Sequence, residues 1–195
     1  MTVLQEIVPG KLYDPAREEY AFLRQEAKSK LYDYNNLHPK EEKLREKAIR
    51  DLFGSCGSNF WIEQPFYCDY GSNIHIGDNV YSNHNLVILD VAEVRLGNNV
   101  IMGPNVGLYT AGHPLDSERR LKGDEFALPI YIEDNVWIGG GVTVVPGVTI
   151  GKDSVIAAGS VVVKNIPSGV VAAGNPCRVL REIGDKDRAI TDFRK

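Results

Sequence analysis

A six-residue period runs through residues 132–163 and constrains the fold more than any other feature of the sequence. Cut into sixes from Ile132, the chain reads IEDNVW, IGGGVT, VVPGVT, IGKDSV, IAAGSV, VVKNIP. Such a period fits neither an α-helix, at 3.6 residues per turn, nor a two-sided strand, at two. It predicts a parallel β-helix, in which each block forms one short strand and one corner. The first position of every block is Ile or Val: Ile132, Ile138, Val144, Ile150, Ile156 and Val162.

The spacing assigns a physical role to each position of the block. The branched first residue points into a narrow prism and stacks on its equivalents in the coils above and below. The small or β-branched fifth residue also points inward, near a corner, while Gly and Asn supply corner backbone because they tolerate positive φ. A single block buries almost nothing, so stability requires a stack of coils.

The period is interrupted at two places. Between Ile76 and Leu96 the phase slips by two residues, which predicts a small insertion at a corner near Asp90. Residues 109–129 then show no period and carry most of the local charge before Ile130 restarts the pattern. A long unpatterned loop inside a compact repeat domain indicates a functional segment.

The two ends of the chain follow other patterns. Residues 1–57 predict a helical hairpin that caps the β-helix, with Asp14-Pro15 as the start of its first helix. The β-helix is expected over 58–180, and 181–195 form a C-terminal helix and tail. Val179, Leu180 and Ile183 suggest that this closing helix is short.

Composition excludes several classes of protein. The formal net charge is −4, without a dominant Lys/Arg run, which disfavours a nucleic-acid partner. Cys56, Cys68 and Cys177 are odd in number and widely spaced, which argues against a disulfide framework or a zinc site. Since no apolar run approaches the ~20 residues of a membrane span and the N-terminus lacks a secretory h-region, we expect a cytoplasmic protein without membrane or metal partners.

Several stretches together resemble the maltose and galactoside O-acetyltransferase branch of the hexapeptide-repeat acyltransferases. They are YGSNIHIG at 70–77, YSNHN at 81–85, GHP at 112–114, NVWIGGGV at 135–142, PGVTIG at 146–151 and AAGNPCRV at 172–179. The resemblance implies a mainly β fold, a left-handed parallel β-helix with an N-terminal α-helical hairpin and a short C-terminal helix. It further implies transfer of acetyl from acetyl-CoA to a sugar hydroxyl, in homotrimers whose active sites lie between subunits.

The resemblance also assigns catalytic roles. The motif histidine falls on His113, the accompanying asparagine on Asn83 and the motif tryptophan on Trp137. Histidine suits the removal of a proton from a hydroxyl, because it is substantially neutral near pH 7. We therefore expect His113 to be the general base, Asn83 to orient the imidazole or the acceptor, and a backbone N–H near Gly139-Gly140 to stabilise the oxyanion.

Donor and acceptor contacts follow from the same resemblance. The donor contacts expected for acetyl-CoA are Gly140, Ala158, Val163, Lys164, Arg178 and Arg181. The acceptor contacts expected for the sugar are Asp14, Asp69, Tyr81, Asn83, Asp90 and Glu125. Asp69 stands where the galactoside branch has Ser, and Glu125 where it has Met, which favours a maltose or glucose acceptor.

Two other interpretations remain open at this level. The acceptor could be a galactoside, an amino sugar or serine. In a protein of another class, the β-helix would be a non-catalytic scaffold or a metal-binding relative, for which His75 and His84 are the additional histidines near the pattern.

Overall fold

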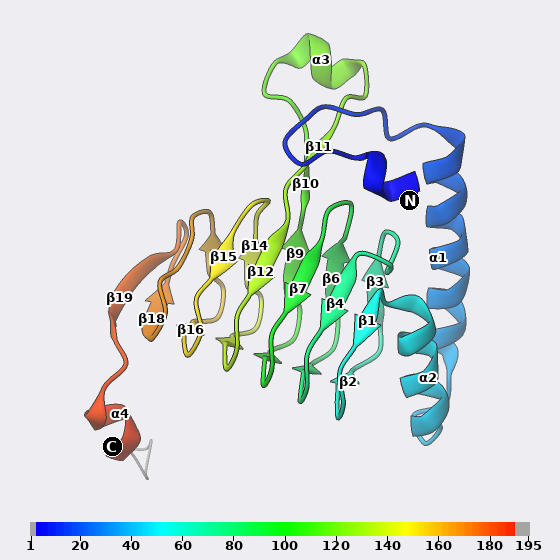
Figure 1. The fold of residues 1–195 in the computed structure, drawn as a ribbon. Coiled ribbons are helices and arrows are strands. Elements are labelled where there is room, and N and C mark those ends of the chain that lie inside the picture. Colours follow the sequence, from blue (N-terminus) through cyan, green and yellow to red (C-terminus); the bar gives the residue numbers. More distant parts are fainter. Residues whose placement is uncertain (1–2, 190–195) are drawn as a thin grey trace.

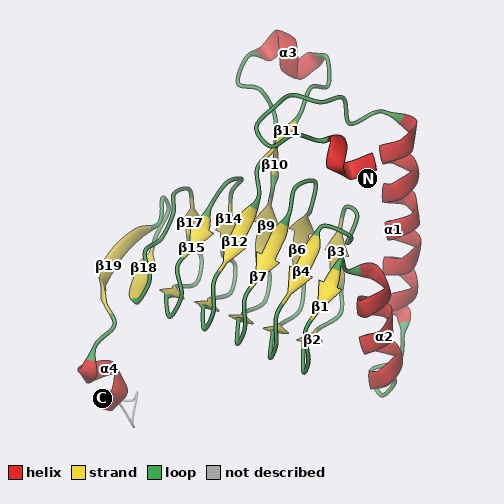
Figure 2. Ribbon diagram, viewed as in Figure 1, coloured by secondary structure: helices red, strands yellow, loops and turns green. Residues whose placement is uncertain are grey.

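The computed structural model describes residues 3–189, which form a parallel β-helix with helices at one end (Figure 1). Two helices, α1 (Glu18–Asn36) and α2 (Glu42–Leu52), lie against its first coil. A loop carrying α3 (Ser117–Leu121) projects from the middle of the stack, and α4 (Asp185–Ala189) follows the last strand (Figure 2). The mainly β architecture and the helical N-terminal region predicted from the sequence are confirmed.

Three parallel sheets form the faces of the prism, and each coil visits them in the same order. Face 1 contains β1 (Ser55–Cys56), β4 (Ile74–Ile76), β7 (Val94–Leu96), β12 (Ile130–Ile132) and β15 (Thr149–Ile150). Face 2 contains β2 (Trp61–Ile62), β5 (Tyr81–Ser82), β8 (Ile101–Met102), β13 (Trp137–Ile138), β16 (Val155–Ile156), β18 (Val170–Ala173) and β19 (Arg178–Glu182). Face 3 contains β3 (Phe66–Cys68), β6 (Leu86–Leu89), β9 (Gly107–Tyr109), β14 (Thr143–Val144) and β17 (Val161–Val162).

The inward positions are those that the period predicted. Ile138, Val144, Ile150, Ile156 and Val162 have no exposed surface, and Ile132 is 2% exposed. The fifth positions are buried as well, and two of them are the small polar residues Ser154 and Ser160. Burial of one such aliphatic side chain contributes about 1.5–3 kcal/mol, so every coil adds to the stability of the stack.

The corner between faces 1 and 2 is held by a ladder of side-chain amides. Its four asparagines and final aspartate all have positive φ, from 53° to 61°: Asn59, Asn79, Asn99, Asn135 and Asp153. Each asparagine donates its amide N–H to the side-chain oxygen of the next rung at 2.7–2.9 Å. Asparagine therefore serves two purposes here, since it tolerates the left-handed corner and links consecutive coils.

The corner between faces 3 and 1 varies in length. The interstrand register pairs Cys68, Ile88, Leu108 and Val144 before this corner, and Ile76, Leu96, Ile132 and Ile150 after it. The chain takes six residues from Val144 to Ile150, eight from Cys68 to Ile76 and from Ile88 to Leu96, and 24 from Leu108 to Ile132. The insertion predicted near Asp90 is confirmed, and three consecutive coils are lengthened at this same edge.

The start of the helical hairpin differs from the sequence prediction. Helix α1 begins at Glu18, and Asp14 instead forms a tight turn in which its carboxylate accepts the Ala16 N–H at 2.9 Å. The side chain of Tyr34 anchors the helix to the β-helix, because its hydroxyl donates to the Ile62 carbonyl at 2.5 Å. The buried residues of α1 are Tyr20, Ala27, Leu31 and Tyr34, which recur at helical spacing.

The expected closing helix was placed too early in the chain. Val179 and Leu180 belong to β19, which pairs antiparallel with β18, and the helix begins at Asp185. By folding back on β18, β19 pairs with the edge of the last coil that would otherwise be exposed. Residues 190–195 of the predicted tail lie outside the described part of the chain.

The asparagine ladder generates a stability prediction. Replacing Asn99 by alanine removes its hydrogen bonds to Asn79 and Asn135 and leaves a Cβ-bearing residue without them at a φ of 58°. We expect this replacement to lower the free energy of unfolding by about 1–3 kcal/mol. Asn99→Gly should lower it less, because glycine tolerates this φ. Urea unfolding of the three proteins measures the difference, and equal losses would show that backbone conformation contributes nothing here.

Candidate functional site

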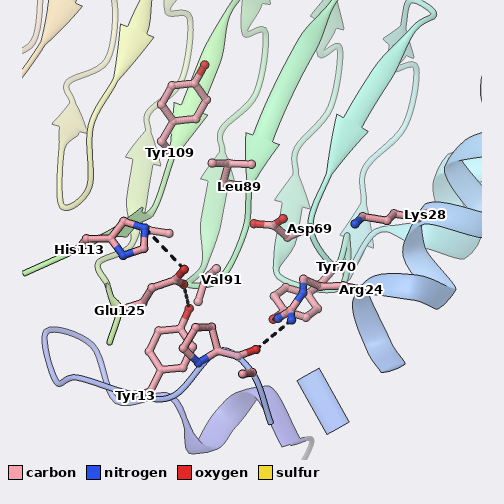
Figure 3. A pocket seen from close by; sticks show the side chains of 13 residues that line it. Tyr13, Arg24, Lys28, Asp69, Tyr70, Leu89, Val91, Tyr109, His113 and Glu125 are labelled. Atoms are coloured by element: carbon pink, nitrogen blue, oxygen red, sulfur yellow. Dashed lines mark hydrogen bonds and ion pairs between the residues drawn. The ribbon is translucent and has the colours of Figure 1, made fainter. Parts of the chain in front are cut away.

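The three lengthened corners surround a cleft of about 670 Å³ at the edge between faces 3 and 1. One wall comes from the corners themselves, with Asp69, Leu89 and Tyr109 at the ends of successive strands (Figure 3). His113 and Glu125 come from the long loop, in which β10 (Ala111–Gly112) pairs antiparallel with β11 (Phe126–Ala127). The remaining wall comes from the N-terminal segment and α1: Tyr13, Pro15, Ala16, Arg24 and Lys28.

The N-terminal segment is tied to the loop opposite His113. Tyr13 and Glu125 exchange backbone hydrogen bonds of 2.9 and 3.1 Å, and the Tyr13 hydroxyl donates to Glu125 Oε2 at 2.5 Å. Burial, followed by the neighbouring Glu125 carboxylate, raises the pKa of Tyr13 well above its usual range, so this hydroxyl remains a donor. The second carboxylate oxygen of Glu125 is thereby turned toward the imidazole, 3.7 Å from His113 Nε2.

The surroundings of His113 favour one tautomer of its ring. Nδ1 lies 3.3 Å from the Asp124 carbonyl oxygen, which can only accept a hydrogen bond. With the proton on Nδ1, Nε2 carries the lone pair and faces Glu125. The side chain is 53% exposed, so solvent and small molecules reach it. This arrangement can accept a proton at Nε2, and the Glu125 carboxylate then stabilises the positive ring that results.

Asp90 organises the cleft from beneath. It is fully buried, and its carboxylate accepts the backbone N–H groups of Asp69, Tyr70 and Asn73 at 2.9–3.3 Å. Burial raises its pKa from 3.8 to about 6, while these hydrogen bonds act in the opposite direction. Asp90 was expected to contact the acceptor sugar directly. This geometry does not fit that role, because no part of the Asp90 side chain reaches the surface of the cleft. It positions Asp69 instead.

Asp69 is the carboxylate that faces the cleft from the β-helix. Burial raises its pKa, whereas Arg24 and Lys28 on the opposite wall lower it. Arg24 is occupied, since it donates to the Tyr70 hydroxyl at 2.8 Å and to the Pro15 carbonyl at 2.9 Å. Tyr13, Arg24 and Lys28 also line the cleft but were not expected from the sequence, because they lie in the N-terminal segment and on α1 and carry no motif. Tyr70 lines it too and opens the stretch YGSNIHIG, although no role was predicted for it. Asp14, which was expected there, turns away to Ala16 and does not line the cleft.

The remaining residues expected at the reaction centre lie on face 2 or just beyond it. Trp137 projects from face 2 and is 54% exposed. Tyr81 is on the same face, two coils earlier. Asn83 follows β5 at the corner between faces 2 and 3, where its side-chain oxygen accepts the His84 N–H at 2.7 Å. Within one chain these three residues do not line the His113 cleft.

The same corner between faces 2 and 3 presents unused backbone donors. Gly139 and Gly141 donate their N–H groups to Ile156 and Pro104, but Gly140, between them, has no backbone acceptor among the described residues. Ala158 occupies the equivalent place one coil further along, and its N–H likewise has no backbone acceptor among the described residues. These two N–H groups lie one coil apart along the corner. Gly140 is the donor that fits the expected oxyanion site.

The cationic residues expected near a donor lie around the last coils. Val163 is 39% exposed, and Lys164 follows it on the surface. Arg178 donates to the carbonyl oxygen of its neighbour Cys177 at 2.8 Å. Arg181 is held by Asp187 through two hydrogen bonds of 2.6 and 2.7 Å, which raise its pKa. To bind a phosphate, Arg181 would have to exchange this partner, whereas Lys164 is exposed and has no side-chain partner in the described part of the chain.

Comparison with known proteins gives consistent matches in the helical region and in the β-helix. Residues 8–57 match the maltose acetyltransferase hexapeptide capping motif, and residues 129–164 match the bacterial transferase hexapeptide model of six repeats. The galactoside O-acetyltransferase of Escherichia coli K12 is 48% identical over 96% of this chain and 93% of its own length. The chain belongs to the hexapeptide-repeat acetyltransferases, in the maltose and galactoside branch.

Further relatives of this acetyltransferase support the assignment. A candidate acetyltransferase of Saccharomyces cerevisiae is 61% identical over the full length of both chains. A galactoside acetyltransferase solved in complex with coenzyme A superposes with a TM-score of 0.93 at 46% identity, covering 100% of this chain and 97% of that one. A maltose O-acetyltransferase of Clostridium difficile 630 gives 0.91 at 45% identity, covering 95% and 99%.

Within 3–189, no three or more His, Cys, Asp or Glu side chains gather as metal ligands would. In the same part of the acetyltransferase, no helix combines the length and apolar character needed to cross a bilayer. Cys56, Cys68 and Cys177 are all free thiols.

Asp90 gives the stability of the protein a pH dependence of defined sign. Because the pKa of the folded state is raised to about 6 from an ordinary value of 3.8, the folded protein binds this proton more tightly than the unfolded chain. The stabilising contribution is full below pH ~4 and is lost as the pH rises through ~6. The test is urea unfolding of the wild type and of Asp90→Asn between pH 4 and 7. Over this range the difference in the free energy of unfolding, wild type minus variant, should fall by up to about 3 kcal/mol. A relative stability that increases with pH would contradict this assignment.

The bond between Tyr13 and Glu125 can be measured by a double-mutant cycle. Tyr13→Phe and Glu125→Gln each disturb the 2.5 Å hydrogen bond, so their effects on unfolding should be non-additive by about 1–2 kcal/mol. Tyr32→Phe is the matched control, because the exposed Tyr32 hydroxyl has no side-chain partner among the described residues. Additive effects would show that the bond does not hold the N-terminal segment to the loop.

Proposed function

We propose that this acetyltransferase moves the acetyl group of acetyl-CoA directly to a hydroxyl of a sugar, with maltose or glucose favoured as the acceptor. The observation that carries the proposal is the position of His113: its Nε2 faces a solvent-accessible cleft between two carboxylates, Asp69 and Glu125. Carboxylates bind vicinal hydroxyls by accepting two hydrogen bonds, and the cleft volume suits a small polar ligand. The relatives named as galactoside and maltose O-acetyltransferases support the same class of reaction.

In this mechanism His113 acts as general base. Nε2 accepts the proton of the sugar hydroxyl as its oxygen attacks the thioester carbonyl. The new C–O bond forms a tetrahedral intermediate whose oxyanion accepts a hydrogen bond from the Gly140 N–H. The C–S bond then breaks, and the proton returns from His113 to the departing thiolate, which leaves as CoA-SH. Glu125 stabilises the ring while it is charged.

The donor is expected to lie along the corner between faces 2 and 3. Its pantetheine amides can accept from the free N–H groups at Gly140 and Ala158 and run past Val163 toward Lys164, Arg178 and Arg181. The solved relative with bound coenzyme A supports an acetyl-CoA donor for this chain. No step of the mechanism calls for a metal ion.

A homotrimer accounts for the separation of the two halves of the site. The cleft with His113 lies at one corner of the prism, and Asn83, Trp137 and Gly140 lie at or beside another. If the His113 cleft of one subunit faces the Gly140 corner of its neighbour, the donor and the acceptor meet between the two chains. Asn83 and Tyr81 would then contribute to the acceptor site in trans. The free thiols fit a cytoplasmic location, in which thiols remain reduced.

An acceptor panel separates this function from its alternatives. Wild-type protein is incubated with acetyl-CoA and glucose, maltose, a β-galactoside, glucosamine or serine, and release of free thiol is followed. Thiol release with sugars that carry only hydroxyl groups supports the proposal, whereas release only with glucosamine or serine assigns the enzyme to amine or serine acetylation. Absence of both CoA binding by calorimetry and thiol release with any acceptor would indicate a scaffold.

The role of His113 leads to a quantitative prediction. His113→Ala should lower kcat for the best acceptor by about 10²–10⁴-fold, because the hydroxyl loses its base. The dissociation constant of CoA, measured by calorimetry, should stay unchanged. The matched control is His75→Ala, whose imidazole lies on face 1 beside Ser55 and Glu93. Unchanged turnover in His113→Ala would remove His113 from the mechanism.

A further inference from the structure

A second cavity, of about 460 Å³, lies next to the His113 cleft, between α1 and β3. Lys28 lines both cavities, and Cys68 of the second is followed directly by Asp69 of the first. The two spaces are therefore adjacent, and together they are called the groove, which starts at His113 and continues along α1. No residue of the second cavity takes part in the mechanism proposed above.

The groove follows from the geometry of its two walls. On α1, Arg24, Lys28, Tyr32 and Asn36 recur every four residues, so they lie along one side of the helix. On the β-helix, the consecutive residues 67–70 form the opposite wall, with Tyr67 and Cys68 at the second cavity and Asp69 and Tyr70 at the first. In Figure 3, Lys28 extends from α1 on the side opposite His113, with Asp69 between them.

The walls are held rigidly by hydrogen bonds beneath the groove. The Asn35 side chain donates to the Phe66 carbonyl and accepts the Phe66 N–H, both at 2.9 Å, which fastens α1 to β3. Gln64 donates to the Tyr34 and Leu37 carbonyls at the C-terminal end of the same helix. A ligand therefore meets a preformed surface and does not have to order the helix on binding.

The exposed groups of the second cavity match a sugar ring. Tyr32 and Tyr67 are 70% and 51% exposed, and such rings offer flat apolar surface with a hydroxyl at the tip. The amide of Asn36 donates to the Tyr32 carbonyl at 2.8 Å, which leaves its oxygen free to accept. Among the described residues that line the cavity, Lys28 is the one with a charged side chain. Apolar C–H faces of a sugar can pack on the tyrosines while its hydroxyls bind the amide and ammonium groups.

We propose that this second cavity is a distal subsite, which holds the next ring of a glycoside or oligosaccharide whose acetylated ring lies at His113. The inference rests on the proposed sugar acceptor and extends it: the substrate class is a sugar with at least two rings. The groove runs from the reactive histidine, so a second ring attached to the first passes Lys28 and Asp69 and then lies between Tyr32 and Tyr67.

The test compares acceptors of one and two rings in matched variants. The quantity measured is the ratio of kcat/KM for maltose to that for glucose, and likewise for phenyl β-galactoside and galactose. The wild type should prefer the two-ring acceptor of at least one pair. Tyr32→Ala and Tyr67→Ala should each lower that ratio by about 3- to 10-fold, the loss expected for one aromatic contact, while glucose turnover is kept. Phe22→Ala is the control, since Phe22 is a 64% exposed aromatic on α1 that lines neither cavity.

The possible outcomes separate the subsite from the proposed function. A ratio that stays the same in both tyrosine variants overturns the subsite, while acetylation of the sugars still supports the function. An equal loss for one-ring and two-ring acceptors also counts against the subsite, because it shows an effect on the cleft as a whole. If the wild type acetylates no sugar, the proposed function itself fails.

Discussion

The hydrogen-bonded register between successive coils is the constraint on which the rest of this structure depends. Each strand must pair in parallel with the strand one coil away, so the three faces cannot change length from coil to coil. Only the corners can lengthen, because a corner residue need not pair with the next coil. The eight-residue corners after Cys68 and Ile88 and the long loop after Leu108 all use the same edge. A cleft arises there because three neighbouring insertions share one wall of the prism.

The cleft is stabilised by a small hydrophobic cluster that is separate from the main core. It consists of Leu4, Ile7, Tyr20, Tyr70, Val91 and Ala127, which come from the N-terminal segment, α1, two corners and the long loop. This cluster holds together segments that the β-helix alone does not order. The helical hairpin therefore does more than cover an open end, because its first residues fix the loop that carries His113. The buried Asp90 adds a polar anchor between the same corners.

Periodic parts of the molecule could be predicted from the sequence, and parts held by single long-range contacts could not. The hexads identified the inward residues, such as Ile138 and Ser160, because stacking repeats one steric requirement at every coil. The loop was found by the failure of the period, and His113 by its motif. The hydrogen bond from Tyr13 to Glu125 joins residues 112 positions apart and leaves no local pattern. Asp90 was expected to contact the sugar from the family resemblance, and a carboxylate at a corner gives no sign of whether it faces solvent or the backbone beneath.

The separation of the two candidate half-sites follows from the cross-section of the prism. His113 stands at the corner between faces 3 and 1, and the free N–H groups of Gly140 and Ala158 stand at the corner between faces 2 and 3. A donor along one corner and an acceptor at the other are separated by the whole width of face 3 within a single chain. Direct transfer needs the reacting atoms within about 3–3.5 Å. If donor and acceptor bind as proposed, one chain holds them at different corners of the prism, so the proposed mechanism requires a neighbouring copy whose donor corner faces this acceptor cleft.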